Sequence, residues 1–127
     1  MIGKNAESKP LVLVAEDDYS SYLLVSTLLT KYLLQPIRAS NGIEAVEMVK
    51  TNPEIKLVLM DMRMPEMDGI EAARLIKSFK PDLPVIFLTA HEMDENQEVI
   101  KDICCDDYLI KPFNRELLRT KLEKFIL

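Results

Sequence analysis

The sequence is short of the residue types that build disulfide-linked or histidine-rich proteins. It has two cysteines, which are neighbours at Cys104 and Cys105, and one histidine, His91. Adjacent cysteines cannot link distant parts of a fold, so a disulfide framework is excluded, and we interpret the pair as small reduced side chains rather than as a redox switch. We interpret His91 as a loop side chain at the rim of a site, rather than as a metal ligand or a proton shuttle.

Long hydrophobic runs are also missing. No apolar run exceeds a few residues, so no segment is expected to span a membrane, and the start of the sequence lacks the apolar core of a signal peptide. The simplest location is therefore the cytoplasm. An excess of positive charge is missing too, because the formal net charge is -5. Nucleic-acid binding requires clustered Lys and Arg, so we expect no direct contact with DNA or RNA.

The residues that are present indicate one globular domain. The chain has 127 residues, of which 48% are hydrophobic and 29% are charged, and this is enough apolar material for a real core. Residues 1–10 are polar and are expected to form an arm. Residues 11–127 are expected to form the domain, without internal repeats.

Short apolar runs of strand length alternate with stretches of helical periodicity. The expected strands are Leu11–Ala15, Pro36–Ala39, Leu57–Met60, Leu83–Leu88 and Tyr108–Ile110. The expected helices run from Tyr19 to about Leu34, from Asn41 to before Pro53, from Asp68 to about Phe79, between Asp94 and Ile103, and from Asn114 almost to Leu127. This alternation predicts an α/β fold, in which right-handed crossovers cover both faces of a parallel sheet.

Finer predictions concern how the helices begin and which face they bury. Asn41, Asp68 and Asn114 stand where N-cap residues are expected. Phe113 and Leu118 occupy the two positions of a hydrophobic staple across the last of these caps. In the first helix, we expect Leu24, Leu28 and Tyr32 to form the inward stripe.

Functional side chains follow four of the expected strands directly. Glu16 and Asp17 follow the first strand, Asp61 the third, Thr89 the fourth and Lys111 the fifth. The carboxyl ends of parallel strands meet at one edge of a sheet, where ligands bind, so we expect these five residues to converge. Three crowded carboxylates repel one another, and a hard divalent cation such as Mg²⁺ relieves that repulsion.

The chemistry that these residues favour is phosphoryl transfer. Asp61 would attack phosphorus in line, and Lys111 and the metal would neutralise the charge that spreads over the phosphoryl oxygens. Thr89 would supply a hydroxyl donor. Asp18 is interpreted as a helix-start residue that the helix dipole favours, rather than as a further metal ligand.

These motifs resemble the receiver domains of two-component response regulators, which are related to the chemotaxis regulator. The likeness extends from Leu11 to Leu127. The matching positions are the acidic pair Glu16 and Asp17, the phosphoacceptor Asp61, the hydroxyl residue Thr89 followed by Ala90, the switch aromatic Tyr108, and the pair Lys111 and Pro112. The resemblance implies a flavodoxin-like, doubly wound (βα)5 fold with sheet order 2-1-3-4-5, and often a cis peptide bond before Pro112.

The resemblance also implies roles for individual residues. Mg²⁺ would be held by Glu16, Asp17, Asp61 and the backbone carbonyl of Arg63. The side chains of Arg63 and His91 would influence how fast the phosphoryl group on Asp61 is hydrolysed.

Partners and output follow from the same resemblance. A histidine kinase or a histidine phosphotransfer protein would donate the phosphoryl group. Thr89 and Tyr108 would act as the switch that changes the surface formed by the fourth helix, fifth strand and fifth helix. Such a domain is not an enzyme in the usual sense, because at most it catalyses its own phosphorylation and dephosphorylation.

One further pattern lies on that output surface. Residues 92–107 contain seven acidic residues and one lysine, whereas residues 111–127 contain five basic and two acidic residues. A partner helix docking across both patches and two merely solvated faces remain alternatives.

Two other functions remain open alongside a phosphorylation switch. A phosphatase of the haloacid-dehalogenase type also uses a nucleophilic Asp with Mg²⁺, but it needs a second Asp where this chain has Arg63. A pseudo-receiver would bind partners without phosphorylation, although the complete set of site residues argues against it.

The residues Cys104 and Cys105 depart from the Gly-Ala that receiver domains usually carry at these positions. No effector sequence follows Leu127, so the chain is interpreted as a stand-alone receiver or as the terminal receiver of a hybrid sensor kinase.

Overall fold

The computed structural model describes residues 9–90 and 106–127. Within them the elements are β1 (Leu11–Ala15), α2 (Tyr19–Lys31), β2 (Gln35–Ala39), α3 (Gly42–Thr51), β3 (Ile55–Asp61), α4 (Gly69–Phe79), β4 (Val85–Thr89), β5 (Asp107–Ile110) and α6 (Arg115–Phe125). The helix expected between Asp94 and Ile103 lies outside the described residues. So do His91, Cys104 and Cys105.

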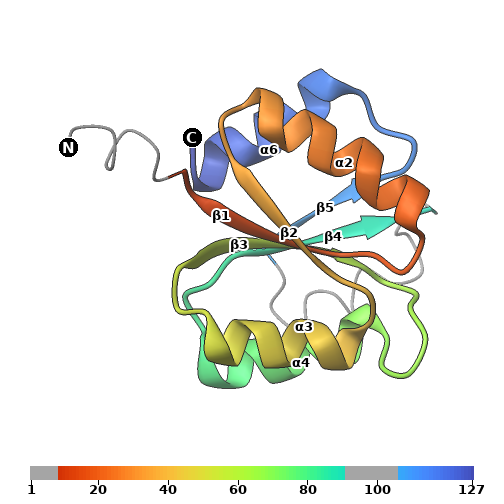
Figure 1. Ribbon diagram of the computed structural model, residues 1–127, viewed down its shortest axis with the longest axis vertical. Helices are drawn as coiled ribbons and strands as arrows, with labels where there is room; N and C mark the ends of the chain where they lie inside the picture. Colours follow the sequence, from red (N-terminus) through yellow and green to blue (C-terminus); the bar gives the residue numbers. More distant parts are fainter. Residues whose placement is uncertain (1–8, 91–105) are drawn as a thin grey trace.

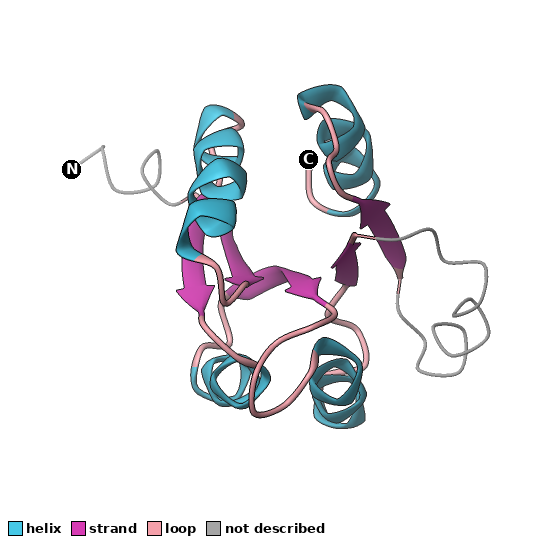
Figure 2. Cartoon of the chain, turned by 90° about the vertical axis from the view of Figure 1, so that its right-hand side faces the viewer, coloured by secondary structure: helices cyan, strands magenta, loops and turns pink. Residues whose placement is uncertain are grey.

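The five strands form one parallel sheet in the order β2-β1-β3-β4-β5. Helices α2 and α6 cover one face of the sheet, and α3 and α4 cover the other (Figures 1 and 2). The prediction of a doubly wound α/β fold and the strand order implied by the resemblance are both confirmed.

Two hydrophobic layers hold the helices to the sheet. Val12 and Val14 of β1 belong to the layer under α2 and α6, whereas Leu13 and Ala15 belong to the layer over α3 and α4. The central strand β3 is buried without a break from Leu57 to Met60. A strand covered on both faces has no polar side to alternate with, which explains its continuous apolar run.

The inward stripe predicted for α2 is wrong by one residue. Val25 and Leu29 are the buried residues, whereas Leu24 is 72% exposed, and Leu28 and Tyr32 pack only at the edge of the layer. Both rows have the same four-residue spacing, so the helical period alone does not decide which row faces the sheet.

Helix α2 also ends three residues before Leu34, at Lys31. Leu33 adopts a positive φ of 64°, which turns the chain out of the helix. The N–H of Leu34 then donates to the carbonyl of Leu29, and the Leu34 side chain is 2% exposed in the core.

Side-chain caps begin all four described helices. Asp18, Asn41, Asp68 and Asn114 each accept a hydrogen bond from the backbone N–H three residues later, which satisfies a donor that the helix cannot. The three caps predicted from the sequence are thus confirmed. Leu118 is buried and Phe113 packs in the same layer, as the predicted staple requires.

Candidate functional site at the carboxyl edge of the sheet

Four neighbouring strands deliver polar side chains to one edge of the sheet. Glu16 and Asp17 follow β1, Asp61 ends β3, Thr89 ends β4 and Lys111 follows β5. Because β1, β3, β4 and β5 are consecutive in the sheet, residues far apart in sequence meet at this edge.

The three carboxylates predicted to crowd together do so. Glu16, Asp17 and Asp61 each offer an oxygen, and these oxygens lie within 4.8 Å of one another. An all-oxygen donor set with open positions for water suits Mg²⁺, so the residues present fit a magnesium ion. The carboxylate of Asp18 makes its hydrogen bonds away from this cluster, because it accepts from both the backbone N–H and the hydroxyl of Ser21. Asp18 lies at the start of α2, as expected from the sequence, and the structure adds that it caps this helix.

Glu16 is the buried member of the acidic cluster. Its side chain is 2% exposed, and it accepts from the Nζ of Lys111 at 3.1 Å and from the backbone N–H of Asp18 at 3.2 Å. Burial and the neighbouring Asp61 raise the pKa of Glu16, and the two hydrogen bonds only partly offset them. The site thus has negative charge that a bound cation would relieve.

Lys111 connects the acidic cluster to a small cavity. Its Nζ lies 3.7 Å from Oδ2 of Asp61, whose side chain is 13% exposed. A cavity of about 190 Å³ opens there, lined by Asp61, Met62, Arg63, Thr89, Ala90 and Lys111. It brings the carboxylate of Asp61, the ammonium group of Lys111 and the side chain of Thr89 to one space. The peptide bond between Lys111 and Pro112 is cis, as the resemblance implied.

The loop after Asp61 is tied to the start of α4. The N–H of Arg63 donates to Oδ1 of Asp61 at 3.3 Å, and the N–H of Gly69 donates to the carbonyl of Met62 at 2.9 Å. A Cβ at Gly69 would lie 2.1 Å from the carbonyl oxygen of Asp61, so only glycine allows this approach. The carbonyl of Arg63 as a metal ligand stays a prediction.

The two residues expected to act as a switch, Thr89 and Tyr108, share one face of the sheet. Thr89 is buried, and its carbonyl accepts from the N–H of Lys111. Tyr108 pairs in register with Phe87, two residues before Thr89, and packs partly buried in the layer over α3 and α4. Since alternate residues of a strand point to the same side, Thr89 and Tyr108 lie on that same side.

Sequence reasoning missed one residue close to the acidic cluster, Arg38 of β2. Its guanidinium donates to the backbone carbonyls of Glu16 and Asp17. Nothing in the sequence connects residues so far apart. The only signal in the sequence was a charged residue within an expected strand. The rings of Tyr19 and Tyr22, which the guanidinium contacts, come close to it only in the folded chain.

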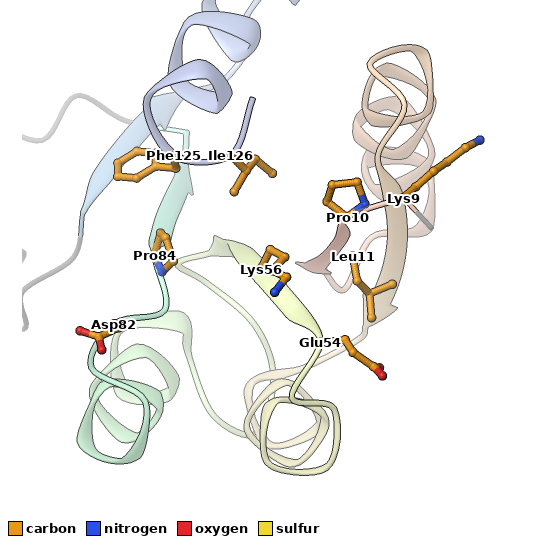
Figure 3. A pocket seen from close by; sticks show the side chains of 9 residues that line it. All are labelled: Lys9, Pro10, Leu11, Glu54, Lys56, Asp82, Pro84, Phe125 and Ile126. Atoms are coloured by element: carbon orange, nitrogen blue, oxygen red, sulfur yellow. The ribbon is translucent and has the colours of Figure 1, made fainter. Parts of the chain in front are cut away.

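Larger hollows than this cavity also open on the described part of the chain, and two of them lie at the edges of the sheet. One, of about 630 Å³, adjoins the site and is lined by Glu16, Ser21, Leu24, Val25, Thr27, Leu28, Ala90, Lys111, Pro112 and Phe113. The other, of about 670 Å³, lies at the opposite edge, between the start of β1 and the end of α6 (Figure 3). It lies away from the edge where functional side chains gather, so it is not the candidate site.

The expected acidic patch at residues 92–107 is partly neutralised within the molecule. Asp106 pairs with Lys77 of α4 at 2.7 Å. Asp107 pairs with Lys121 and Lys124 of α6 at 2.9 and 2.8 Å. These two aspartates and the two α6 lysines therefore hold elements together, and they contribute less to a partner surface than their charges suggested.

Comparison with known sequences finds one family model and several related proteins that are similar to most of this chain. The sequence pattern of the response regulator receiver domain matches residues 12–123. Sporulation initiation phosphotransferase F of Bacillus subtilis is 33% identical, over 91% of this chain and 92% of that protein. The transcriptional regulatory protein ZraR of Klebsiella oxytoca is 39% identical over 89% of this chain, which spans 25% of ZraR.

Solved structures of receiver proteins superpose closely. Chemotaxis protein CheY4 of Vibrio cholerae is 25% identical with a TM-score of 0.87, covering 94% of this chain and 100% of that one. The receiver domain of sensor histidine kinase PA1611 from Pseudomonas aeruginosa is 28% identical with a TM-score of 0.86, covering 94% and 98%, and was solved with magnesium in its active site cleft. The receiver domain of Saccharomyces cerevisiae Ssk1 is 29% identical with a TM-score of 0.84, covering 92% and 88%, and was solved with the histidine phosphotransfer protein Ypd1.

Among the residues that the structure describes, no helix combines the length and the apolar character needed to cross a bilayer.

Proposed function

Because this chain belongs to the response regulator receiver domain family, we propose that it is a phosphorylation-dependent switch whose phosphoacceptor is Asp61. Receiver domains are signalling domains of two-component systems rather than classical enzymes. The observation that carries the proposal is the convergence of Asp61 with Glu16, Asp17 and Lys111 at one edge of the sheet. We propose a cytoplasmic location, as expected from the sequence.

The reaction that fits this arrangement is phosphoryl transfer from a phosphohistidine. An oxygen of the Asp61 carboxylate attacks phosphorus, and the P–N bond breaks with its electron pair returning to the imidazole. Lys111 stabilises the negative charge on the transferring oxygens, and the Thr89 hydroxyl donates to one of them. A magnesium ion bound by Glu16, Asp17 and Asp61, with the carbonyl of Arg63, would supply additional neutralising charge. Arg63 and His91 would tune how fast water then hydrolyses the product.

The output is a changed surface rather than a released product. When Thr89 moves toward the phosphoryl group, Tyr108 follows on the same face of the sheet and alters the surface beside β5 and α6. The expected fourth helix, which lies outside the described residues, would complete that surface.

The hollow beside the site is suited to the phosphohistidine donor. Leu24, Leu28 and Phe113 give it an apolar lining, and Glu16 and Lys111 form its end nearest to Asp61. We infer that a helix of a histidine kinase or phosphotransfer protein docks there, since a receiver domain similar to this chain was solved with such a protein. Docking there would bring a phosphohistidine to the cavity at Asp61.

Two alternatives are less well supported. A dehalogenase-type phosphatase needs an acid two residues after its nucleophile, where this chain has the exposed Arg63. A pseudo-receiver would not need a buried Glu16 beside Asp61, where burial and then the charge of Asp61 raise the pKa of Glu16.

The test is the intact mass of the chain after incubation with acetyl phosphate and Mg²⁺. We expect one added phosphoryl group, labile to hydroxylamine, absent from Asp61→Asn and present in the control Asp82→Asn, an exposed aspartate before β4. Chelation of Mg²⁺ should prevent the addition. An adduct that persists in Asp61→Asn would contradict the assignment, and no adduct even with a phosphohistidine donor would favour the pseudo-receiver.

A further inference from the structure

The edge strand β2 holds the backbone of both acidic residues that follow β1. Nη2 of Arg38 donates to the carbonyl of Asp17 at 2.9 Å, and Nε donates to the carbonyl of Glu16 at 3.2 Å. From the same strand, the carbonyl of Ala39 accepts from the N–H of Glu16 at 2.9 Å. The planar guanidinium thus bridges two successive peptide groups with two parallel donors, which an ammonium group does not reproduce.

Two tyrosines in the first turn of α2 cover the same guanidinium. Cζ of Arg38 lies 5.3 Å from the ring centre of Tyr19 and 5.7 Å from that of Tyr22. The two rings stack, with centres 6.1 Å apart and planes inclined by 27°. A cation against aromatic faces is attracted by their electrons, so the rings orient the guanidinium between α2 and the acidic loop.

The acidic loop needs such a restraint. The oxygens of Glu16, Asp17 and Asp61 lie within 4.8 Å of one another, and without a bound cation their repulsion favours any movement that separates them. Asp17 is exposed, so its side chain is held by the backbone more than by packing. Hydrogen bonds to the two carbonyls oppose a swing of the backbone that would carry Glu16 and Asp17 away from Asp61.

We propose that Arg38 is a positioning residue that sets the affinity of the acidic cluster for a divalent cation by fixing the backbone of Glu16 and Asp17. This inference rests on the proposed function, because it takes the cluster to be a metal site. Arg38 does not touch the metal or the phosphoryl group in this role. It acts through the peptide groups that carry two of the ligands.

The sign of the effect separates positioning from simple electrostatics. A guanidinium close to a divalent cation repels it, so removing the charge alone should tighten binding. Removing a positioning residue should weaken binding, because the ligands then lose their arrangement. A residue that serves only the stability of the fold should lower the melting temperature and leave the affinity unchanged.

The experiment is a titration of the chain with Mn²⁺, followed by the electron paramagnetic resonance signal of the free ion, with Mg²⁺ as competitor. Arg38→Met keeps the apolar stem and removes the donors, and we expect its dissociation constant to rise about tenfold. Arg38→Lys keeps the positive charge but lacks the two planar donors of the guanidinium, and it should also bind Mn²⁺ more weakly than the wild type. Arg119→Met, which removes a charge paired with Glu123 on α6, is the matched control and should bind as the wild type does.

The outcomes are distinct. Urea unfolding in the presence of a chelator shows which variants fold without metal. If Arg38→Met does not fold, the affinity of Arg38→Lys for Mn²⁺ tests the positioning role. Equal or tighter binding by the folded variant overturns the positioning role while leaving the proposed function intact. A wild-type chain that binds no Mn²⁺ overturns the metal site itself, and with it this inference.

Discussion

At the scale of single residues, Lys111 contacts two carboxylates, and its removal should affect phosphorylation and metal binding differently. It donates to the buried Glu16 and lies 3.7 Å from Asp61. Lys111→Met should slow phosphorylation by acetyl phosphate about a hundredfold, because the variant lacks the cation that stabilises charge in the transition state. Mn²⁺ should bind equally or more tightly, since a positive charge beside the cation has gone.

The rate comes from mass spectra taken during the reaction, and the affinity from the Mn²⁺ titration. Lys56→Met, an exposed lysine at the opposite edge of the sheet, is the control and should change neither. Unchanged phosphorylation in Lys111→Met would contradict the role given to this residue.

The sequence predicted which acidic residues gather but not what holds them. Glu16, Asp17 and Asp61 each follow a recognisable strand, and strand ends meet by a general rule, so their convergence could be predicted. Arg38 could not be found this way, because its partners are backbone carbonyls. A peptide carbonyl is present at every position and leaves no mark in the sequence. Contacts of this kind appear only once two strands are in register.

At the scale of elements, α2 carries an exposed apolar residue at the hollow beside the site. Leu24 is 72% exposed and lines that hollow. Leu24→Glu should slow phosphotransfer from a phosphohistidine protein about tenfold or more, because a charge would be desolvated against the docking helix. Phosphorylation by acetyl phosphate, which needs no docking surface, should not change.

The donor for this measurement is phosphorylated Ypd1, and transfer is followed by the intact mass of both proteins. Leu23→Glu provides the control on the same helix, since Leu23 is 44% exposed and does not line the hollow. If Leu24→Glu and Leu23→Glu slow transfer equally, or if neither does, the donor docks elsewhere.

The elements differ in how well the sequence predicted them. Strand β1 has the predicted bounds. Three helix starts were identified by their caps, because the side chain of an N-cap accepts from a backbone N–H only three residues later. The inward row of α2 was wrong because the choice between Leu24 with Leu28 and Val25 with Leu29 depends on what the helix packs against. The caps depend on residues three positions apart and were predicted, whereas the buried row of α2 depends on the sheet against which the helix packs.

At the scale of the whole molecule, the strand order explains where the site lies. From β1 the chain passes to β2 on one side, and from β2 it crosses over to β3 on the other side of β1. Such a reversal opens a crevice at the carboxyl ends of β1 and β3, where Glu16, Asp17 and Asp61 meet. Periodicity predicted a parallel sheet, but strand order is a matter of pairing and came only from the resemblance to a family.

Ion pairs join the edge strand β5 to helix α6. Asp107 of β5 accepts from Lys121 and Lys124 of α6, and its side chain is 11% exposed. Burial raises the pKa of Asp107, but the hydrogen bonds from Lys124 and Lys121 outweigh it, so the net pKa is lowered. Because the folded pKa lies below the unfolded value, the pairs stabilise the fold above pH 4, and this contribution is lost as the pH falls through the folded pKa.

Asp107→Asn should therefore lower the free energy of unfolding by about 1 kcal/mol at pH 7. The difference from the wild type should begin to shrink as the pH falls below about 4, where the unfolded aspartate takes up its proton, and should be lost as the pH falls through the lower folded pKa. Urea unfolding from pH 7 to pH 3 measures it, and Asp82→Asn, which removes an exposed charge before β4, should run parallel to the wild type. A difference between Asp107→Asn and the wild type that stays constant with pH would mean that the amide disturbs packing. In that case the ion pairs would not be what joins β5 to α6.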